Sequence, residues 1–333
     1  ALIRDALVEE LSALGRSELH AQIAARFEAA GDDGAAQSVG RIAYHYSEAA
    51  ELEPQLNSKA AEYAVLAAES AGRVSAWREA AQQYERALEL LRRDPADSLE
   101  REGRVLIRLA EAEYAAGNAA DGERHYRAAV GAHRGSGGGV ELASSILKWV
   151  SRSFQYPAPG ERRRLVTEAL EAVGDEDDVL RARLLAELLN GTDESAKPEQ
   201  AAEVRALAEL HQLGDVEARL AIWDAQRHYA ARRWDEYRDR LYEAALKFRQ
   251  AGDRRGLSMR SLADSIPILV GTFDEATALD ARVVGAAEQF GNAGYAALLR
   301  GRLAIVEIHR GNRERARELL DGATLSRREH VML

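Results

Sequence analysis

The feature of the sequence closest to a chemical motif is the glycine-rich run at residues 134–139, which precedes an expected helix. Backbone amides at the start of a helix can hold a phosphate or another anion. This run has no Lys-Ser or Lys-Thr pair after its glycines and no strand before it, so the parts of a phosphate-binding loop are missing. We therefore expect a loop between two helices, with anion binding as the alternative.

The sequence also contains no pattern typical of a metal site or of a catalytic nucleophile. The eight histidines are scattered, and no pair has H-E-x-x-H spacing. The acidic run at residues 175–178 lacks the glycine and the spaced ligands of an EF-hand, so we interpret it as the cap of the following helix. The arginines at residues 162–164 are expected on a solvated helix face, with anion or partner docking as the alternative.

The chain also has no cysteine and no G-x-S-x-G turn. Thiolate ligands, disulfides and cysteine nucleophiles are thereby excluded, and a serine hydrolase is disfavoured. We predict no catalytic residue, no metal and no cofactor, and therefore no enzyme in this chain, although a longer parent protein could carry an ATPase.

The composition is that of a soluble helical chain. Of its 333 residues, 46% are hydrophobic, mostly Ala and Leu, which are strong helix formers. The 45 basic and 55 acidic residues give a net charge of −10, which repels a phosphate backbone, so we expect no nucleic-acid partner. No stretch approaches the ~20 apolar residues of a membrane span, and no signal-peptide pattern opens the sequence. We expect a cytoplasmic location and no membrane partner.

A helical repeat accounts for most of the chain. Residues 77–91 place apolar side chains at steps of three and four, which is one stripe on a helix. A helix is expected before it at residues 59–71, ended by Gly72, and Pro95 stops the pattern after it. Tetratricopeptide-like units carry a small, a large and another small residue in their second helix. The matching sets are Ala80, Tyr84 and Ala87; Gly122, Tyr126 and Ala129; Tyr237, Leu241 and Ala244; Gly271, Phe273, Ala276 and Val283; Gly311, Ala316 and Leu320.

These sets recur at a period of about 39 residues, with one gap that has room for two more units. In that gap we expect helix pairs at residues 140–154 with 161–173, and at 179–190 with 198–213. The predicted fold class is all-α: a right-handed α-solenoid of tetratricopeptide-like helix pairs, with about seven repeats of roughly 39 residues.

Residues 1–50 do not fit this repeat. We expect three helices there, at residues 2–14, 18–29 and 36–50, separated by Gly15 and by the Gly-Asp-Asp-Gly stretch at 31–34. LIRDALVEEL at 2–11 and LHAQIAARFE at 19–28 resemble the junction in large bacterial signalling ATPases, where "LIRDALYEEL" at the end of a winged-helix segment runs into "LHARIAEALE" and then into tetratricopeptide-like repeats. The resemblance is specific over about residues 1–93, and it includes AYHYSEA at 43–49.

Members of that family include MalT-like LuxR-type transcriptional regulators and class III cyclases with an AAA-type ATPase module. The resemblance implies that residues 1–50 are a helical junction following a missing winged-helix and ATPase part, and that residues 51–333 are the repeat solenoid. It implies a regulatory or sensor domain that binds a protein or peptide partner or a small effector. The alternative is a stand-alone tetratricopeptide scaffold for assembling a protein complex.

In such arrays the first helix of each pair lines the concave face. The residues we expect in that groove are Glu111, Tyr114, Trp149, Tyr156, Gln226 and Tyr229. Aromatic side chains in a groove favour recognition because they give a large contact area at low entropic cost. The alternative is that Trp149 and Tyr229 pack between repeats. LSRREHVML at 325–333 superficially resembles the start of a LuxR-type DNA-binding domain, but we favour the first helix of another repeat.

Overall fold

The computed structural model describes residues 12–30, 35–94, 99–152, 158–189, 198–253, 255–274 and 293–321. Throughout these ranges the regular elements are helices, so the described chain is all-α. It forms two compact units, Ala1–Glu187 and Leu188–Leu333. The division falls inside α10 (Asp178–Leu189) rather than at residue 50, and it leaves the predicted role of residues 1–50 as a junction untested.

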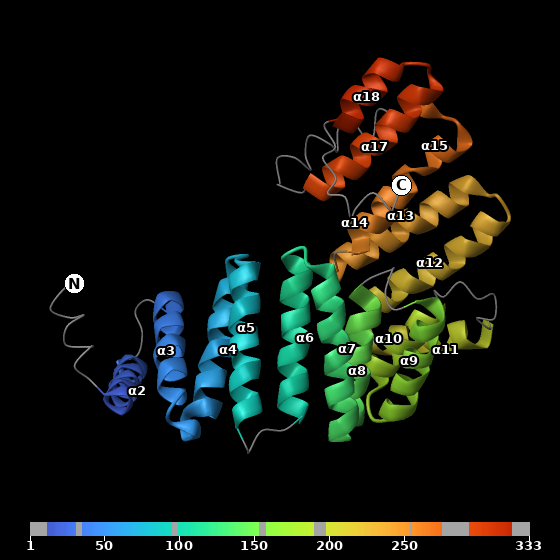
Figure 1. Cartoon of the computed structure of the whole chain (residues 1–333). Helices are drawn as coiled ribbons and strands as arrows, with labels where there is room; N and C mark the ends of the chain where they lie inside the picture. The colour runs from blue at the N-terminus through green and yellow to red at the C-terminus, as the bar shows by residue number, and fades with distance from the viewer. Residues whose placement is uncertain are drawn as a thin grey trace. The chain divides into compact units, whose positions relative to one another are not determined.

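Unit 1 is a row of helices in which each helix packs against the next one along the chain, from α2 to α9 (Figure 1). Its elements before α10 are α2 (Ala13–Ala29), α3 (Ala35–Ala50), the short 3₁₀ helix η1 (Pro54–Leu56), α4 (Asn57–Arg73), α5 (Trp77–Arg93), α6 (Leu99–Ala115), α7 (Ala119–Ser136), α8 (Gly139–Arg152) and α9 (Pro159–Val173).

Unit 2 continues the same arrangement of helix pairs, with contacts between α11 and α12, α12 and α13, α13 and α14, and α17 and α18. Its elements are α11 (Pro198–His211), α12 (Gly214–Ala230), α13 (Trp234–Gln250), α14 (Arg255–Asp264), α15 (Ile266–Val270), α17 (Ala293–His309) and α18 (Arg313–Asp321). The α-solenoid of helix pairs is confirmed, and α8 to α11 lie where the two units missing from the signature were expected.

Seven turns that follow a helix in the described ranges share one geometry. In each, a residue with positive φ follows the first helix, and the next backbone N–H donates to the carbonyl five residues before it. This is a Schellman-type closure, which satisfies the last carbonyls of the helix. The left-handed residues of these turns are Ser75, Gly117, Gln212, Arg232, Gly252, Gly271 and Gly311. Three of these residues are not glycine, and for that reason the glycines in the sequence indicated only some of the turns.

Two predicted helix ends were wrong. Gly72 does not end the helix before Trp77, because α4 continues through it to Arg73 and the turn falls at Ser75. A Cβ at Gly72 would lie 3.1 Å from the Trp77 ring, so this glycine makes room for the ring. Gly15 does not separate two helices either. α2 begins at Ala13 because the Ser12 hydroxyl accepts a hydrogen bond from the Gly15 amide, which is an N-cap.

The repeat signature marks the core. Ala80, Tyr84 and Ala87 are buried in α5, and Tyr126 and Ala129 are buried in α7. α4 faces its neighbours with alanines, and small side chains there let helices approach closely (Ala60, Ala61, Ala64, Ala67, Ala68 and Ala71). In unit 2 the same positions of α13, namely Leu241 and Ala244, are buried with Phe248, and Ala316 is buried in α18, whereas Leu320 is exposed. Ala276 and Val283 lie outside the described residues.

Arginine–glutamate pairs connect equivalent helices of neighbouring pairs in unit 1. Arg101 and Arg108 of α6 contact Glu62 and Glu69 of α4, and α7 and α9 are joined in the same way by Arg127 with Glu161 and Arg134 with Glu168. Each set repeats after seven residues, two helical turns, so both pairs lie on one face of the helix. Exposed ion pairs stabilise weakly, by about 0–1 kcal/mol each, so these contacts contribute little to the stability of the array.

The glycine-rich run at 134–139 forms a tight turn rather than an open loop. α7 extends to Ser136, Gly137 has a φ of 78°, and α8 begins at Gly139. A Cβ on Gly139 would lie 2.3 Å from the carbonyl oxygen of Ala172 in α9, so a side chain cannot be accommodated there. The glycines are therefore explained by the turn and by the close approach of α8 and α9.

Candidate functional site

The predicted groove residues fall in both units, so no single unit contains them all. Glu111 and Tyr114 are in α6 and Trp149 is in α8 of unit 1, while Gln226 and Tyr229 are in α12 of unit 2. Tyr156 lies outside the described residues.

In unit 1, Trp149 is a packing residue and not a groove residue. Its side chain is 1% exposed, its Nε1 donates to the Glu123 carboxylate at 2.7 Å, and the Arg127 guanidinium lies 5.0 Å from its ring centre. This is the packing alternative given above. Burial of the large ring is favourable because its one polar atom has a partner. Glu111, half-buried, lies 3.7 Å from Lys148 Nζ.

Tyr114 is half-buried and packs against its own helix pair. Its ring centre lies 5.9 Å from that of Tyr126, and a Cβ on Gly122 would lie 2.5 Å from its ring. Gly122, the small residue of the repeat signature, therefore admits the Tyr114 ring between α6 and α7. Tyr114 is therefore a packing residue and does not line an open site.

In unit 2, Tyr229 belongs to a group of three aromatic rings where α12 turns into α13. Its ring centre lies 5.5 Å from that of Trp234 and 5.3 Å from that of Tyr237. Tyr229 is 53% exposed, and Trp234 and Tyr237 are half-buried. Gln226, one turn before Tyr229 on α12, is also exposed. Among the predicted groove residues that the structure describes, Gln226 and Tyr229 are exposed, and the Glu111 side chain is 44% exposed.

The same unit contains a pocket that the sequence analysis missed. It lies between α13 and α14 and encloses about 490 Å³, within the usual range of roughly 300–1,000 Å³ for ligand sites. Its lining residues are Tyr242, Ala245, Leu246, Arg249, Asp253, Gly256 and Arg260. We call it the α13–α14 pocket. No spacing within one helix could have indicated it, because its residues come from two helices with different registers.

Gly256, one of the lining residues, allows close packing of α13 and α14 beside this pocket. A Cβ on Gly256 would lie 2.8 Å from the carbonyl oxygen of Ala245 and 3.2 Å from the backbone nitrogen of Arg249. A side chain at this position would therefore push α14 away from α13. The residue is buried, and the pocket opens beside the contact that it permits.

The two carboxylates at the pocket are already engaged. Asp264, 2% exposed, accepts a hydrogen bond from the Tyr242 hydroxyl at 2.7 Å and lies 3.2 Å from Arg260 Nε. Burial and the Asp264 carboxylate raise the pKa of Tyr242 to about 12, so this phenol remains a donor at neutral pH. Asp253 accepts from the backbone amide of Arg255 at 2.9 Å and pairs with the Arg255 side chain.

Arg249 is different, because among the described residues its guanidinium has neither a hydrogen bond nor an ion pair, and the residue is exposed. The lining thus carries Arg249, Arg260 and one aspartate that is already paired. An arginine presents five N–H donors in a planar fork and is always charged. The pocket therefore offers positive charge and unused donors beside an apolar wall.

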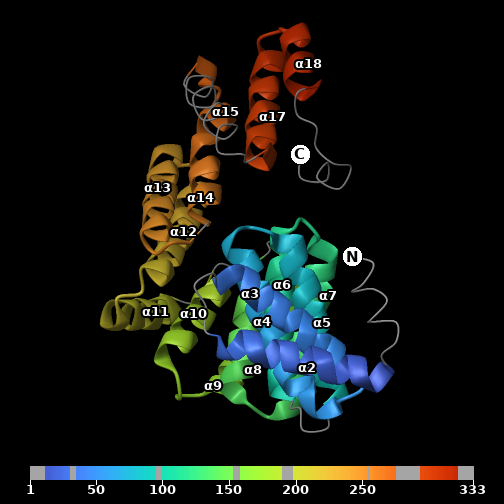
Figure 2. The same ribbon diagram turned by 90° about the vertical axis from the view of Figure 1, so that its left-hand side faces the viewer.

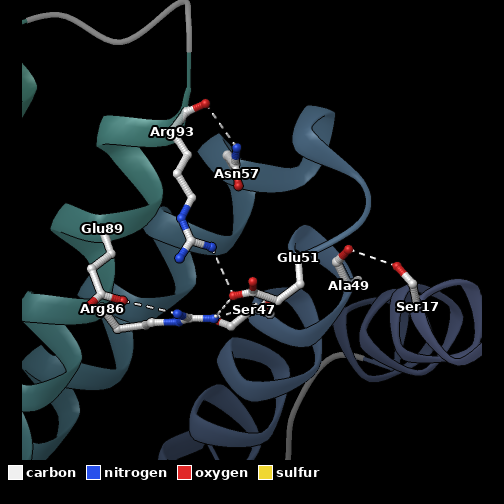
Figure 3. Close-up of polar contacts among 8 residues, drawn as sticks. All are labelled: Ser17, Ser47, Ala49, Glu51, Asn57, Arg86, Glu89 and Arg93. Atoms are coloured by element: carbon white, nitrogen blue, oxygen red, sulfur yellow. Dashed lines mark hydrogen bonds and ion pairs between the residues drawn. The ribbon is translucent and has the colours of Figure 1, made fainter. Parts of the chain in front are cut away.

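At the other end of the chain, polar contacts fasten α2 and α3 onto the first repeat (Figure 3). Ser17 Oγ of α2 donates to the Ala49 carbonyl oxygen at 2.8 Å. Glu51, after α3, accepts from Arg86 at 2.7 Å and from Arg93 at 2.9 Å, both on α5. The two arginines lower the pKa of the Glu51 carboxyl and place positive charge at the C-terminal end of α3, where the helix dipole favours it. We call these five residues the junction network.

A second contact joins α2 to α3 and α4. The Glu28 carboxylate accepts hydrogen bonds from Tyr46 at 2.6 Å, from Lys59 at 2.6 Å and from Tyr63 at 2.9 Å. The hydrogen bonds from Lys59 and Tyr46 hold the pKa of Glu28 below its usual value. Glu28 is the last residue of the segment that resembles the signalling-ATPase junction. In Figures 1 and 2, α2 lies across α3 rather than alongside it, unlike the antiparallel helices that follow.

The remaining chemical candidates have structural explanations. His133 is buried, with its ring nitrogens 2.6 Å from Ser145 Oγ and 3.2 Å from the Glu100 carbonyl oxygen. His20 and His45, whose spacing in the sequence indicates no contact, have their Nδ1 atoms 3.1 Å apart between α2 and α3. No cluster of three or more metal-ligating side chains is found in the described part of the chain. Asp177 caps α10, its carboxylate accepting from the Leu180 amide at 2.8 Å.

The predicted solvated arginine face holds only in part. Arg163 and Arg164 are exposed, but Arg162 is half-buried, donates to the Val150 carbonyl oxygen and lies 3.4 Å from the buried Glu187. Its charge is needed to balance Glu187 in the interior of unit 1. None of the helices in the described ranges is both long and apolar enough to span a membrane.

No protein-family model and no curated protein matches this chain. Among solved structures, it is similar to the Signal Transduction ATPase with Numerous Domains (STAND) protein with a tetratricopeptide repeat sensor from Pyrococcus horikoshii, with 14% sequence identity and a TM-score of 0.48. That match covers 98% of this chain and 54% of the other, so this chain spans about half its length.

Two further structures are similar. The human IFIT1 dimer with PPP-AAAA has 13% identity and a TM-score of 0.35, with 86% of this chain and 68% of that chain covered. A circular tandem repeat protein with novel repeat topology has 17% identity and a TM-score of 0.26, with 97% and 86% covered. At these identities and TM-scores, none of the three carries information on the function of this chain.

Proposed function

We propose that this chain is the regulatory, sensor part of a bacterial signalling ATPase, either a transcriptional regulator or a nucleotide cyclase. In this proposal it binds a protein partner or a small effector and performs no catalysis of its own. A regulatory arm needs a surface for a ligand and a firm connection through which binding changes the rest of the protein.

The observation that carries the proposal is how the junction-like segment is attached. Residues 19–28, which resemble the family's junction, form most of α2, and α2 is fastened at both Ser17 and Glu28. The partners of these two residues belong to α3 and α4, apart from Glu53, which follows α3 and lies 3.2 Å from Ser17 Oγ. The segment that would continue from an ATPase is therefore joined to the first repeat. A loosely tethered linker would lack such contacts, because ordering its side chains costs conformational entropy.

The gene sequence upstream of Ala1 gives the first test. An encoded ATPase with a phosphate loop followed by a winged helix supports the proposal, and a start codon directly before Ala1 contradicts it in favour of the stand-alone scaffold. If the ATPase is present, nucleotide hydrolysis by the full-length protein tests the connection itself.

For that second test, Glu28→Gln removes the charge that binds Lys59, and Glu48→Gln, at an exposed site on α3, is the matched control. We expect the first variant to change the basal hydrolysis rate and the second to leave it unchanged. Equal rates for both variants and the unmodified protein would contradict a role of α2 in transmitting the signal.

A further inference from the structure

We propose that the α13–α14 pocket binds a small organic anion, a carboxylate or phosphate monoester that carries an apolar group. This inference deepens the proposed function, on which it rests for its biological meaning, by giving the effector a chemical class and a place.

The charge distribution selects an anion. Both aspartates near the pocket are engaged, Asp253 with Arg255 and Asp264 with Tyr242 and Arg260. Arg249 has no partner of its own in the described part of the chain. Among the described residues at and beside the pocket, the three arginines Arg249, Arg255 and Arg260 exceed the two aspartates by one positive charge. A charged guanidinium can hold a carboxylate or a phosphate through two parallel hydrogen bonds.

The second arginine adds to this preference. Arg260 contacts Asp264 through Nε, at 3.2 Å from each carboxylate oxygen, and its guanidinium lies 5.3 Å from the centre of the Tyr242 ring. The Asp264 contact and the tyrosine ring fix the direction of the side chain, while its two terminal nitrogens form no hydrogen bond or ion pair with the described residues. A fixed arginine loses less entropy when a ligand binds than a freely rotating one.

The wall selects an apolar group next to the anion. Leu246 is 45% exposed although it lines a pocket, and Ala245 lies one residue before it. An apolar group placed against Leu246 removes this surface from water, which is favourable by about 25 cal/mol per Å². The volume of about 490 Å³ suits a ligand of small-molecule size, whereas an inorganic ion would fill only a fraction of it.

The overall charge of −10 does not oppose this proposal. Charges separated by more than about 8–10 Å are largely screened at physiological ionic strength. Affinity for a small anion therefore depends on the arginines at the pocket and not on the net charge of the chain.

Isothermal titration calorimetry with the complete 333-residue chain tests the proposal. The probes are phenyl phosphate and phenylacetate, with methyl phosphate to remove the apolar group and benzyl alcohol to remove the charge. We expect phenyl phosphate or phenylacetate to bind, methyl phosphate to bind more weakly and benzyl alcohol not to bind measurably. The stronger of the two aromatic anions identifies the acidic group.

Three variants locate the binding. Arg249→Ala should weaken it roughly tenfold or more, because a charge-assisted pair is lost. Arg249→Lys keeps the charge without the fork and should give an intermediate affinity. Leu246→Ala should weaken the aromatic anions about two- to fourfold and leave methyl phosphate unchanged. Arg317→Ala, an exposed arginine on α18 with the same change of charge, is the control and should bind as the unmodified chain does.

Three results would overturn the proposal. The first is an absence of heat with both aromatic anions, and the second is equal affinities for the Arg249→Ala and Arg317→Ala variants. The third is an Arg249-dependent response to an Asp/Glu-rich peptide without any response to the small anions, which would assign the pocket to an acidic protein partner. The titration needs no upstream domain, so its failure leaves the proposed regulatory role to be decided by the gene sequence and the hydrolysis assay.

Discussion

In both units an arginine guanidinium lies over an aromatic ring, but the surroundings of the two contacts differ. In unit 1, Arg127 lies over the buried Trp149, and its guanidinium is paired with Glu161 at 2.6 Å. In unit 2, Arg260 lies over Tyr242 at the edge of an open pocket, and the nearby Arg249 has no partner among the described residues. An arginine beside an aromatic ring therefore joins helices in unit 1 and lines a pocket in unit 2.

The difference shows what makes a site in a repeat protein. A helix array needs many charged residues for solubility, and some of them pair across neighbouring helices, as the arginine–glutamate pairs of α4, α6, α7 and α9 do. A site arises where that pairing is incomplete beside an exposed apolar surface.

The largest effect is expected from the two aromatic residues that the sequence placed in one groove. Trp149→Ala should reduce the free energy of unfolding by about 3–5 kcal/mol, the range for deleting a large buried ring. Tyr229→Ala, at a residue that is 53% exposed, should cost about 1 kcal/mol or less. Urea denaturation followed by circular dichroism measures both. Similar losses for the two variants would mean that Trp149 and Tyr229 are equally buried, which contradicts the contrast between the units.

The next largest effect on stability is expected from a substitution of Glu28, and this effect should depend on pH. Its three hydrogen-bond partners should make Glu28→Gln less stable than the unmodified chain by about 1–3 kcal/mol at pH 7. Because its pKa is lowered in the folded state, this stability is present above the unfolded pKa of about 4.3 and is lost as the pH falls through the folded value. Melts from pH 7 to pH 3 should show the difference between the two proteins shrinking below about pH 4.5. A difference independent of pH would exclude the charge of Glu28 as its cause.

The smallest effect concerns the turn between α12 and α13. Arg232 has a φ of 55°, and glycine adopts this conformation without the cost that a side chain brings. Arg232→Gly should raise the stability by about 0.5–1 kcal/mol. The neighbouring Arg233 has a φ of −89°, so Arg233→Gly removes the same charge without relieving strain and should not stabilise. A gain in melting temperature for Arg233→Gly as large as that for Arg232→Gly would show that charge, not conformation, is responsible.

The sequence by itself determined the class of fold and the positions of most helices. The step of three and four in α5, the small–large–small pattern around Tyr84, and the period near 39 were sufficient, because all three are consequences of helix geometry. The same period placed α8 to α11, where no signature was visible. The ends of helices were less well determined, since Gly72 and Gly15 were interpreted from residue type without knowledge of the Trp77 ring or the Ser12 cap.

The tertiary structure alone decided which side chains are accessible. Trp149 and Tyr229 occupy similar places in the repeat pattern, yet only the first is covered, since burial depends on the neighbours that a helix receives. The α13–α14 pocket likewise depends on the contact at Gly256 and on which arginines the aspartates engage, neither of which is periodic. The periodicity of the sequence determines the face of a helix on which a residue lies. Only the packing of the helices determines which neighbours cover that face.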